Sequence, residues 1–149
     1  MSNPNILPSD RVRLAGVIDP DAYAVGTVTS GWVSMADYQN IMAVVFAGDL
    51  GTAATLDAKI EQASDSAGTG AKDITGKAIM QLTKAGTDDN KQAVINVHHS
   101  DLDVDNSFTH VRLSMTVGTA ASDAGGVIFG FDARYEPEAD AASVDEIVS

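Results

Sequence analysis

The feature that most constrains this chain is a strict alternation of apolar and polar residues in two segments, 55–61 and 110–117. This two-residue period is typical of a β-strand with one face in a core and the other in water. Other extended runs lie between clusters of glycine, proline and aspartate, and none has the apolar period of a helix of about ten residues. We therefore predict an all-β fold: an antiparallel, jelly-roll-like β-sandwich of about eight strands.

The remaining strands are predicted from the runs between turn signals. The run 41–47, IMAVVFA, is apolar throughout, which predicts a strand covered on both faces, by this chain or by another subunit. Trp32 is the only tryptophan and is expected in the core, within a segment, 23–35, that predicts one bent strand or two short ones. The other predicted strands are 11–18, 77–83, 92–98 and 127–135, with turns or loops at 19–21, 36–40, 64–76, 85–91, 100–107 and 118–126.

The chain has 149 residues, enough for one domain with a self-standing core. Residues 1–9 have no periodicity and predict a flexible N-terminal arm. Residues 10–135 carry all the predicted strands and form the sandwich domain. Residues 136–149 are rich in acids and alanine, which predicts a mobile acidic tail or a weak terminal helix.

Acidic residues outnumber basic ones by 21 to nine, so the formal net charge is −12. Nucleic-acid binding draws its affinity from lysine and arginine, and anionic membranes repel negative charge, so we expect neither partner. The charge suits docking on a basic or mixed protein surface, and an equal alternative is that it reflects only the salinity or proteome style of the source organism. The absence of cysteine excludes disulfides and thiolate chemistry. No secretion signal or apolar run of roughly 18 residues is present, so we expect the protein in the cytoplasm or in an assembly built there.

The glycine-rich stretch 68–77, GTGAKDITGK, has some of the composition of a phosphate-binding loop but not its spacing. Five residues separate Gly70 from Gly76, and Ala78 stands where a serine or threonine would coordinate magnesium. This pattern favours a surface loop over a nucleotide site.

Three alternating aspartates imitate the start of a calcium-binding loop, but Asn106 replaces its glycine and Arg112 replaces its bidentate glutamate. A capped turn explains the segment better, with Ser100 as the cap and with Leu102 and Val104 pointing inward. The aspartates concerned are Asp101, Asp103 and Asp105.

The histidines predict no metal site. His98 and His99 are adjacent, so in a strand their side chains point to opposite faces. His110 and Asp101 could complete a His/Asp site only if their strands paired. The chain also has no GxSxG nucleophile elbow and no telling pair of serine and histidine. We therefore predict no enzymatic activity, no cofactor and no bound metal.

Five segments together resemble a family of small structural, head decoration-like proteins of tailed bacteriophages and related prophage-like particles. The resemblance covers residues 32–135 and depends on the order and spacing of the segments. It implies a role in virion assembly and carries no catalytic motif. The segments are VSMADYQNIMAVVFAGDLG, ATLDAKIEQASDSAGTGAKDITGKAIMQLT, DDNKQAVINV, LDVDNSFTHVRLSMTVG and GFDARY.

From this resemblance we expect a capsid decoration or cement protein that binds the outside of the head lattice, with the major capsid protein as partner. It would form a homo-oligomer, with a trimer favoured, and would be located in the virion after assembly in the host cytoplasm. A tail, connector or fibre-base protein is one alternative, and a glycan-binding or hydrolytic jelly roll is another. Contact regions are expected in the N-terminal arm, in the loop 118–126 and at Ser64, Ser66, Gly68, Thr69, Gly70, Lys72 and Asp73.

Overall fold

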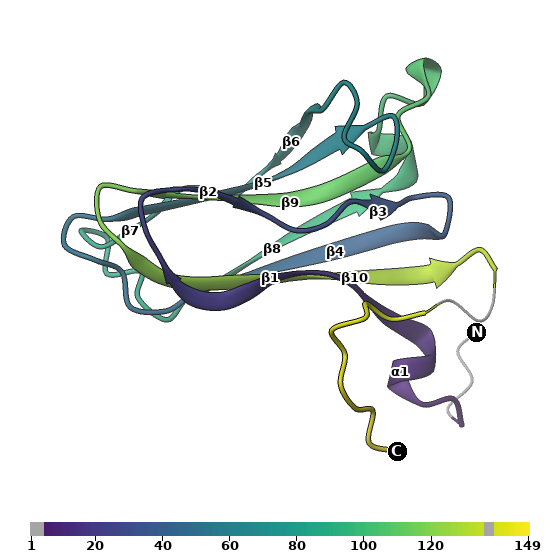
Figure 1. The fold of residues 1–149 in the computed structure, drawn as a ribbon, viewed down its shortest axis with the longest axis horizontal. Helices are drawn as coiled ribbons and strands as arrows, with labels where there is room; N and C mark the ends of the chain where they lie inside the picture. The colour runs from purple at the N-terminus through teal and green to yellow at the C-terminus, as the bar shows by residue number, and fades with distance from the viewer. Residues whose placement is uncertain (1–4, 136–138) are drawn as a thin grey trace.

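The computed structural model describes residues 5–135 and 139–149 as two antiparallel sheets packed face to face (Figure 1). The all-β prediction is therefore confirmed. No helix in the described part of the chain is long and apolar enough to span a membrane. The elements are α1 (Pro8–Arg11), β1 (Val12–Tyr23), β2 (Gly26–Thr29), β3 (Val33–Ser34), β4 (Tyr38–Ala47), β5 (Thr55–Ala63), β6 (Lys72–Ala78), β7 (Leu82–Thr83), β8 (Gln92–His98), η1 (His99–Asp101), η2 (Val104–Asn106), β9 (His110–Gly118) and β10 (Ser122–Ala133).

The strand order is that of a jelly roll. One sheet has four strands in the order β1-β10-β4-β8, and the other has six, with a main path β2-β9-β5-β6 to which the short β3 and β7 add. Without β3 and β7, the first strand pairs with the eighth, the second with the seventh, the third with the sixth and the fourth with the fifth. This nested antiparallel pairing is a two-stranded ribbon folded over on itself, which gives two sheets of four main strands. It confirms the predicted jelly-roll-like sandwich.

The core lies between the two sheets and is built mainly from the alternating segments. Leu56 and Ile60 on β5 and Leu113 on β9 are at most 1% exposed. On the four-stranded sheet β4 and β8 contribute the facing side chains, including Ile41 and Val97, each 1% exposed. The predicted inward faces of β5, β8 and β9 are therefore confirmed.

Four predicted turns or loops have wrong bounds, and in one of them, 36–40, the last three residues belong to β4. The Asp19-Pro20-Asp21 cluster does not end β1, which continues to Tyr23. The pairing of β1 with β10 shifts between Ile18 and Asp21, so Pro20 lies in an irregularity where its missing N–H removes no ladder bond. The other two errors concern the predicted loops 64–76 and 118–126.

Both loops are shorter than predicted, because glycine and other small residues stand inside strands. Residues 72–76 belong to β6, and the chain leaves the sheet at residues 79–81 before β7, so 77–83 is not one strand. Residues 122–126 belong to β10, where the inward side of Gly126 is covered by Leu113: a Cβ there would lie 2.6 Å from Leu113 Cδ2. Small residues in this stretch make room for the facing sheet.

The segment 100–107 forms two 3₁₀ turns, but Ser100 is not the cap. The His98 side chain accepts from Ser100 N, and the Asp101 carboxylate accepts from His98 N at 2.8 Å. Leu102 is buried as predicted, whereas Val104 is 59% exposed. The strand ends at His98 and η1 begins at His99, so the opposite-face prediction is wrong: the two imidazole centroids lie 4.2 Å apart.

The C-terminal segment 139–149 meets the outer edge of β1, the outermost strand of the four-stranded sheet. Leu14 N donates to Asp140 Oδ1 at 2.7 Å, and Ala141 N donates to Leu14 O at 2.7 Å. Residues 139–149 contain no helix, so the helical alternative is wrong for this part of the tail. The predicted arm and tail also include residues 1–4 and 136–138, which lie outside the described residues.

Candidate docking surface

The side chains of the four-stranded sheet that point away from the core form an apolar surface, here called the outer apolar face. Phe46 is 48% exposed and Val94 is 54% exposed, although both are large apolar residues. The other members are partly exposed. The face comprises Val12, Leu14 and Val17 of β1, Val127, Phe129 and Phe131 of β10, Met42, Val44 and Phe46 of β4, and Val94 of β8.

The strand register makes this face continuous. One row across the four strands is apolar from edge to edge, because each residue is directly opposite the next. Side chains directly opposite each other in an antiparallel pair have Cβ atoms about 4.5–5.5 Å apart, so neighbours in such a row touch. The row is Val17, Val127, Val44 and Val94, and beside it lies the row Leu14, Phe129, Met42 and Asn96.

β10 places its bulk on the outside. Its inward side includes Gly126 and Gly130, and a Cβ on Gly130 would lie 2.5 Å from the Tyr38 ring. Its outward side carries Phe129 and Phe131. An aromatic side chain gains most when its whole surface leaves water, so these two rings are only partly stabilised in the isolated chain.

The outer face of the six-stranded sheet is polar instead. Lys59 pairs with Asp73 at 2.7 Å, and the Arg112 guanidinium donates to Glu61 at 3.0 Å. Hydrogen bonding to Asp73 raises the pKa of Lys59. Charges on this face thus have partners within the chain. A contiguous apolar surface on the other sheet is the stronger indication of a binding site.

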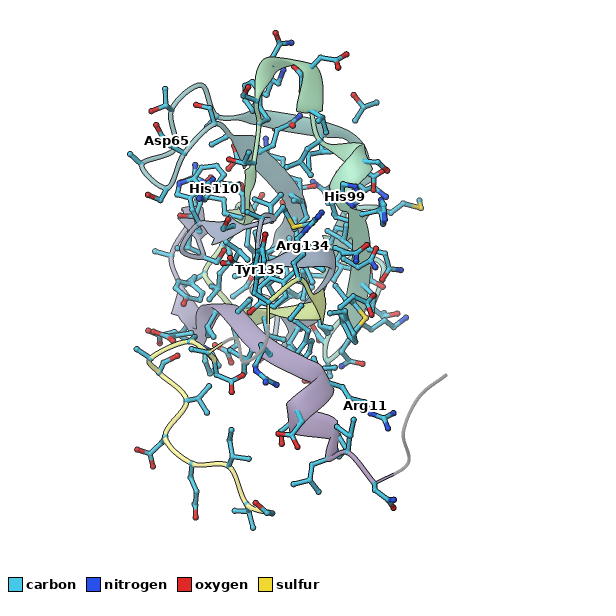
Figure 2. All side chains as sticks on the ribbon, turned by 90° about the vertical axis from the view of Figure 1, so that its right-hand side faces the viewer. Arg11, Asp65, His99, His110, Arg134 and Tyr135 are labelled. Carbon is cyan, nitrogen blue, oxygen red and sulfur yellow. The ribbon has the colours of Figure 1, made fainter. Side chains whose placement is uncertain are left out.

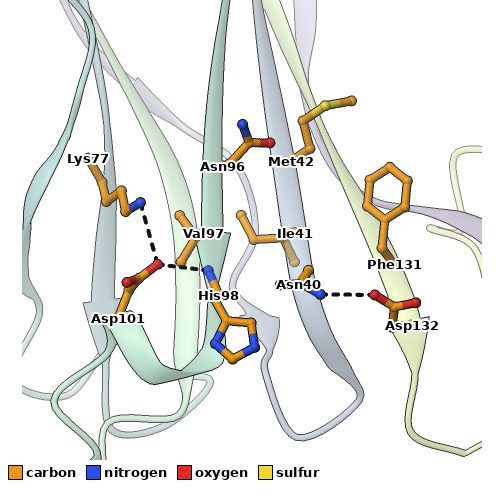
Figure 3. A pocket seen from close by; sticks show the side chains of 10 residues that line it. All are labelled: Asn40, Ile41, Met42, Lys77, Asn96, Val97, His98, Asp101, Phe131 and Asp132. Carbon is orange, nitrogen blue, oxygen red and sulfur yellow. Dashed lines mark hydrogen bonds and ion pairs between the residues drawn. The ribbon is translucent and has the colours of Figure 1, made fainter.

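A hollow of about 480 Å³ lies at one end of the outer apolar face, where Met42 and Phe131 meet polar groups from the sheet edge (Figure 3). Asn40 Nδ2 donates to Asp132 Oδ2 at 2.9 Å, and Lys77 Nζ lies 3.4 Å from Asp101 Oδ2. The backbone N–H of His98 and the Lys77 ammonium lower the pKa of Asp101.

Two further hollows border the same face. One, of about 380 Å³, has Phe46 beside Asp21 and Asp123 at the opposite end of the strands. The other, of about 300 Å³, lies at the β1 edge, where tail residues including Asp140 and Ile147 meet the face. Each of the three hollows therefore combines an apolar part of the face with at least one carboxylate.

The predicted contact loop is compact and lies elsewhere. Asp65 Oδ1 accepts from Ala67 N at 2.9 Å and from Thr69 N at 3.1 Å, and these interactions, those of Thr69 above all, lower the pKa of Asp65. Gly68 has φ of 82° and packs against Trp32, and the Arg112 guanidinium lies 4.5 Å from the centroid of the Trp32 ring. Trp32 is thus half-buried beneath a loop, and its predicted place in the core is wrong.

The seven predicted contact residues fall into two groups. Ser64, Ser66, Gly68, Thr69 and Gly70 lie in this loop, at the end of the sandwich seen in Figure 2 with Asp65 and His110. The remaining two begin β6 and have partners within the chain.

Lys72 lies 2.5 Å from Asp103 and 4.2 Å from the centre of the Phe108 ring, and Asp73 pairs with Lys59. None of the seven belongs to the outer apolar face, and their contact role stays a prediction.

The residues of the calcium-loop-like and phosphate-loop-like segments form ion pairs within the chain. Asp101 and Asp103 bind separate lysines, and in the described residues no group of three or more potential ligand side chains could hold a metal ion. Lys77 pairs with Asp101 rather than facing a phosphate loop.

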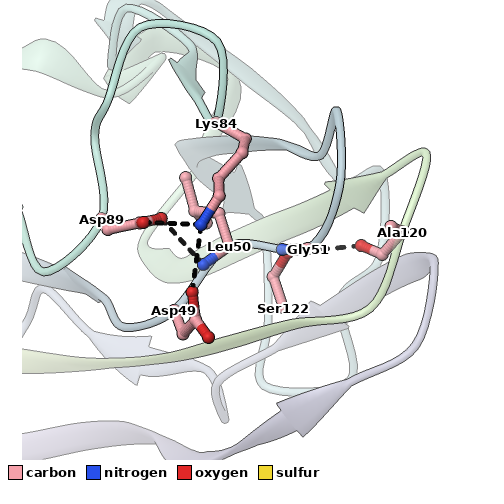
Figure 4. Close-up of polar contacts among 7 residues, drawn as sticks. All are labelled: Asp49, Leu50, Gly51, Lys84, Asp89, Ala120 and Ser122. Carbon is pink, nitrogen blue, oxygen red and sulfur yellow. Dashed lines mark hydrogen bonds and ion pairs between the residues drawn. The ribbon is translucent and has the colours of Figure 1, made fainter.

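The opposite end of the sandwich is closed by a polar cluster (Figure 4). Lys84 Nζ lies 2.7 Å from Asp89 Oδ2 and 3.2 Å from Asp49 Oδ1, which raises the pKa of Lys84. Asp89 also accepts from Leu50 N at 3.0 Å, and Gly51 N donates to Ser122 Oγ at 3.1 Å. These bonds hold three neighbouring loops together and account for the polar residues there structurally.

The outer apolar face was not among the contact regions expected from the sequence. The run 41–47 did indicate a second apolar side, and its inner side is buried as expected, but this chain leaves Phe46 exposed on the other side. The alternative of cover by this chain is therefore wrong at Phe46, and cover by another subunit stays a prediction. The shared face of Val127, Phe129 and Phe131 was a second signal.

No family model matches the chain, and no curated protein matches it. Among solved structures, a chain of infectious bursal disease virus Gx strain is 13% identical with a TM-score of 0.45, over 91% of this chain and 37% of that chain. A chain of the cowpea mosaic virus empty virus-like particle is 10% identical, with a TM-score of 0.43, over 87% of this chain and 85% of that one. The CBM22-1–GH10 modules of Clostridium thermocellum xylanase 10B are 13% identical, with a TM-score of 0.41, over 88% of this chain and 29% of that one. The fold assignment rests on the strand pairing described above.

Proposed function

We propose that this chain is a structural protein of a virion, and that it decorates the outside of the head of a tailed bacteriophage or related particle. The observation that carries the proposal is the outer apolar face, because an apolar sheet surface of this extent is stabilised when an assembly covers it. The sequence resemblance over residues 32–135 supports the same role. The major capsid protein is the proposed partner.

The proposed contribution is mechanical and involves no catalysis. A sheet held in a sandwich presents its side chains with little flexibility, so binding costs little conformational entropy. A standard protein interface buries roughly 800 Å² per partner, and many modest contacts in one shell add up through multivalency. A small symmetric oligomer, with a trimer favoured, would bind several lattice positions together.

The glycan-binding alternative has less support in the side chains. Sugar platforms use exposed aromatic rings, whereas Trp32 is enclosed between Gly68 and Arg112. Two aromatic side chains are well exposed, Phe46 at 48% and Tyr135 at 72%. They line separate hollows, so they do not combine into one sugar platform.

Quantitative mass spectrometry of gradient-purified particles from the source tests the proposal. We expect copy numbers in the hundreds, in constant ratio to the major capsid protein. Heads of particles that lack this chain should be less resistant to heat or low salt. Copy numbers of a few to several dozen would indicate a tail, connector or vertex protein instead. Absence from the particles would overturn the structural role and favour the glycan alternative.

A further inference from the structure

We infer that the outer apolar face is the docking surface, and that its partner is a protein surface with an apolar centre and a border of lysine and arginine. The inference deepens the proposed function, on which it rests, by naming the face of the chain and the chemistry of the partner. It follows from the charges around the face and from the way the edge of the sheet is occupied.

The centre of the face requires an apolar partner. Val44 and Val94 are neighbours in the continuous valine row, with exposed Phe46 next along β4. Burying apolar surface contributes about 25 cal/mol per Å², and no charged side chain interrupts the row. A polar partner would leave this contribution unused.

The border of the face is acidic on three sides. Asp21 and Asp123 lie beside Phe46 at one end, Asp132 lies beside Phe131 at the other, and Asp140 lies beside Leu14 at the β1 edge. Within residues 5–135 and 139–149 none of these four carboxylates forms an ion pair. Their charges are available to cations of a partner.

The cations around the face do not offset this border. Lys77 already pairs with Asp101, and the buried Arg13 guanidinium donates to Ser9 O. Arg11 is exposed on α1, outside the two sheets (Figure 2). On the β8 side the flanking residues Gln92 and Asn96 are uncharged amides. Lys91, next to Gln92, pairs with Asp88, so a partner that carries positive charge would add ion pairs at this border.

The charge pattern disfavours a second copy on the same face. In a two-fold contact the same patch appears on both subunits, so the two acidic borders would meet, and each chain has a formal charge of −12. A partner with an opposite charge pattern gains attraction at the border and speeds encounter.

The partner approaches the face rather than the β1 edge. Leu14 N and O already bond to Asp140 and Ala141 of the tail, so this part of β1 offers no hydrogen bonds to an added strand. The tail side chains Val144 and Ile147 instead border the hollow beside Leu14, so the tail forms a wall at one side of the docking surface.

The test measures binding of the purified full-length chain to particles of the source that lack it, by co-sedimentation. Phe46→Glu and Val94→Glu place a charge in the centre of the face, and Thr29→Glu places the same charge on exposed β2 of the other sheet as a control. We expect at least roughly tenfold weaker binding for the first two variants and unchanged binding for the control. Equal thermal unfolding of all three free variants shows that folding is preserved.

The border is tested with the double variant Asp21→Lys and Asp123→Lys. We expect binding of the wild-type chain to weaken as salt increases, and the variant to bind roughly threefold more weakly at low salt with less salt dependence. Sedimentation of the free chain completes the test by measuring its oligomeric state. We expect one species, of the same size for wild type and Val94→Glu.

Three results overturn the inference. If wild type binds the particles and Phe46→Glu and Val94→Glu bind equally well, the docking face is wrong while the proposed function stands. If wild-type oligomers dissociate in Val94→Glu, the occupant is a second copy of the chain. If the wild-type chain does not bind the particles, both the inference and the proposed function fail.

Discussion

The outer faces of the two sheets share one fold and one side-chain period, yet their chemistry is opposite. On the six-stranded sheet Lys59 and Arg112 have carboxylate partners within the chain. On the four-stranded sheet most of the equivalent positions are apolar, and four carboxylates at their border form no ion pairs among the described residues: Asp21, Asp123, Asp132 and Asp140. The charged groups of the first face are paired and solvated in the free chain, whereas the apolar second face is stabilised when a partner covers it.

This difference assigns different roles to the two sheets. When a partner covers a sheet whose outer charges are already paired, both ions of each pair lose their hydration. The pairs themselves contribute little binding free energy to offset this cost. A sheet with valine and phenylalanine outside gains from leaving water. The four-stranded sheet is therefore the contact side of the molecule in our interpretation, and the six-stranded sheet is its solvent side.

The largest effect should separate the two sides of β8. Val97 is 1% exposed and faces the core, whereas Val94 on the same strand is 54% exposed on the outer apolar face. We expect Val97→Ala to lower the free energy of unfolding by about 2 kcal/mol, because two buried methyl groups are lost. Val94→Ala should change it by no more than about 0.5 kcal/mol. Urea unfolding measures both, and equal losses would show that the outer face is buried in the free chain.

The inner side of β10 offers the next largest effect. A Cβ at position 130 would lie 2.5 Å from the buried Tyr38 ring, so Gly130→Ala should destabilise the chain by about 1–3 kcal/mol through overpacking. Gly31→Ala is the matched control, since a Cβ at position 31 meets nothing within 4 Å. Thermal unfolding compares the two, and a stable Gly130→Ala variant would contradict the tight inner packing.

The ion pair on the solvent side should contribute less. We expect Glu61→Gln to cost about 0.2–1 kcal/mol, because the Arg112–Glu61 pair is only partly shielded from water. A double-mutant cycle with Arg112→Met isolates the pair from the contact of Arg112 with Trp32. The particle-binding assay should not respond to Glu61→Gln, and a loss of binding there would assign the contact side to the wrong sheet.

The smallest effects per residue should appear in acid. Hydrogen bonds lower the pKa of Asp101, Asp103 and Asp89, so their contribution to stability is present above the ordinary aspartate pKa of 3.8 and is lost as the pH falls through the folded-state pKa. We expect the urea midpoint to decline below pH 3.8. Lys72→Met, which removes the main partner of Asp103, should reduce that decline, and an unchanged acid profile would contradict the assigned pairing.

Several parts of the fold could be predicted from local patterns. The segments 55–61 and 110–117 lie within β5 and β9, and the residues predicted to point inward there are buried. The local patterns gave wrong predictions where a residue's role depends on a segment distant in the sequence. Pro20 normally ends a strand, but here it lies in a register shift that removes no pairing. The glycines of β10 look like a loop in sequence, yet they pack beneath Tyr38 and Leu113.

The candidate site was harder to predict than the fold. The glycine-rich loop around Gly68 and Gly70 suggested contact because polar loops lie on surfaces, but it packs on Trp32 and Phe108 of its own chain. The apolar run 41–47 held the better signal, but only the structure showed that the chain leaves its second side exposed at Phe46.

The sequence by itself determined that the chain forms strands, that two of them have one dry and one wet face, and that it carries strong negative charge. These properties follow from side-chain period and composition, which are local or additive. Only the tertiary structure decided the nested strand order, the continuity of the valine row across four strands and the acidic border around it. Those features depend on which distant segments pair and in which register, and a period of two specifies that a strand has two faces without specifying what covers either one.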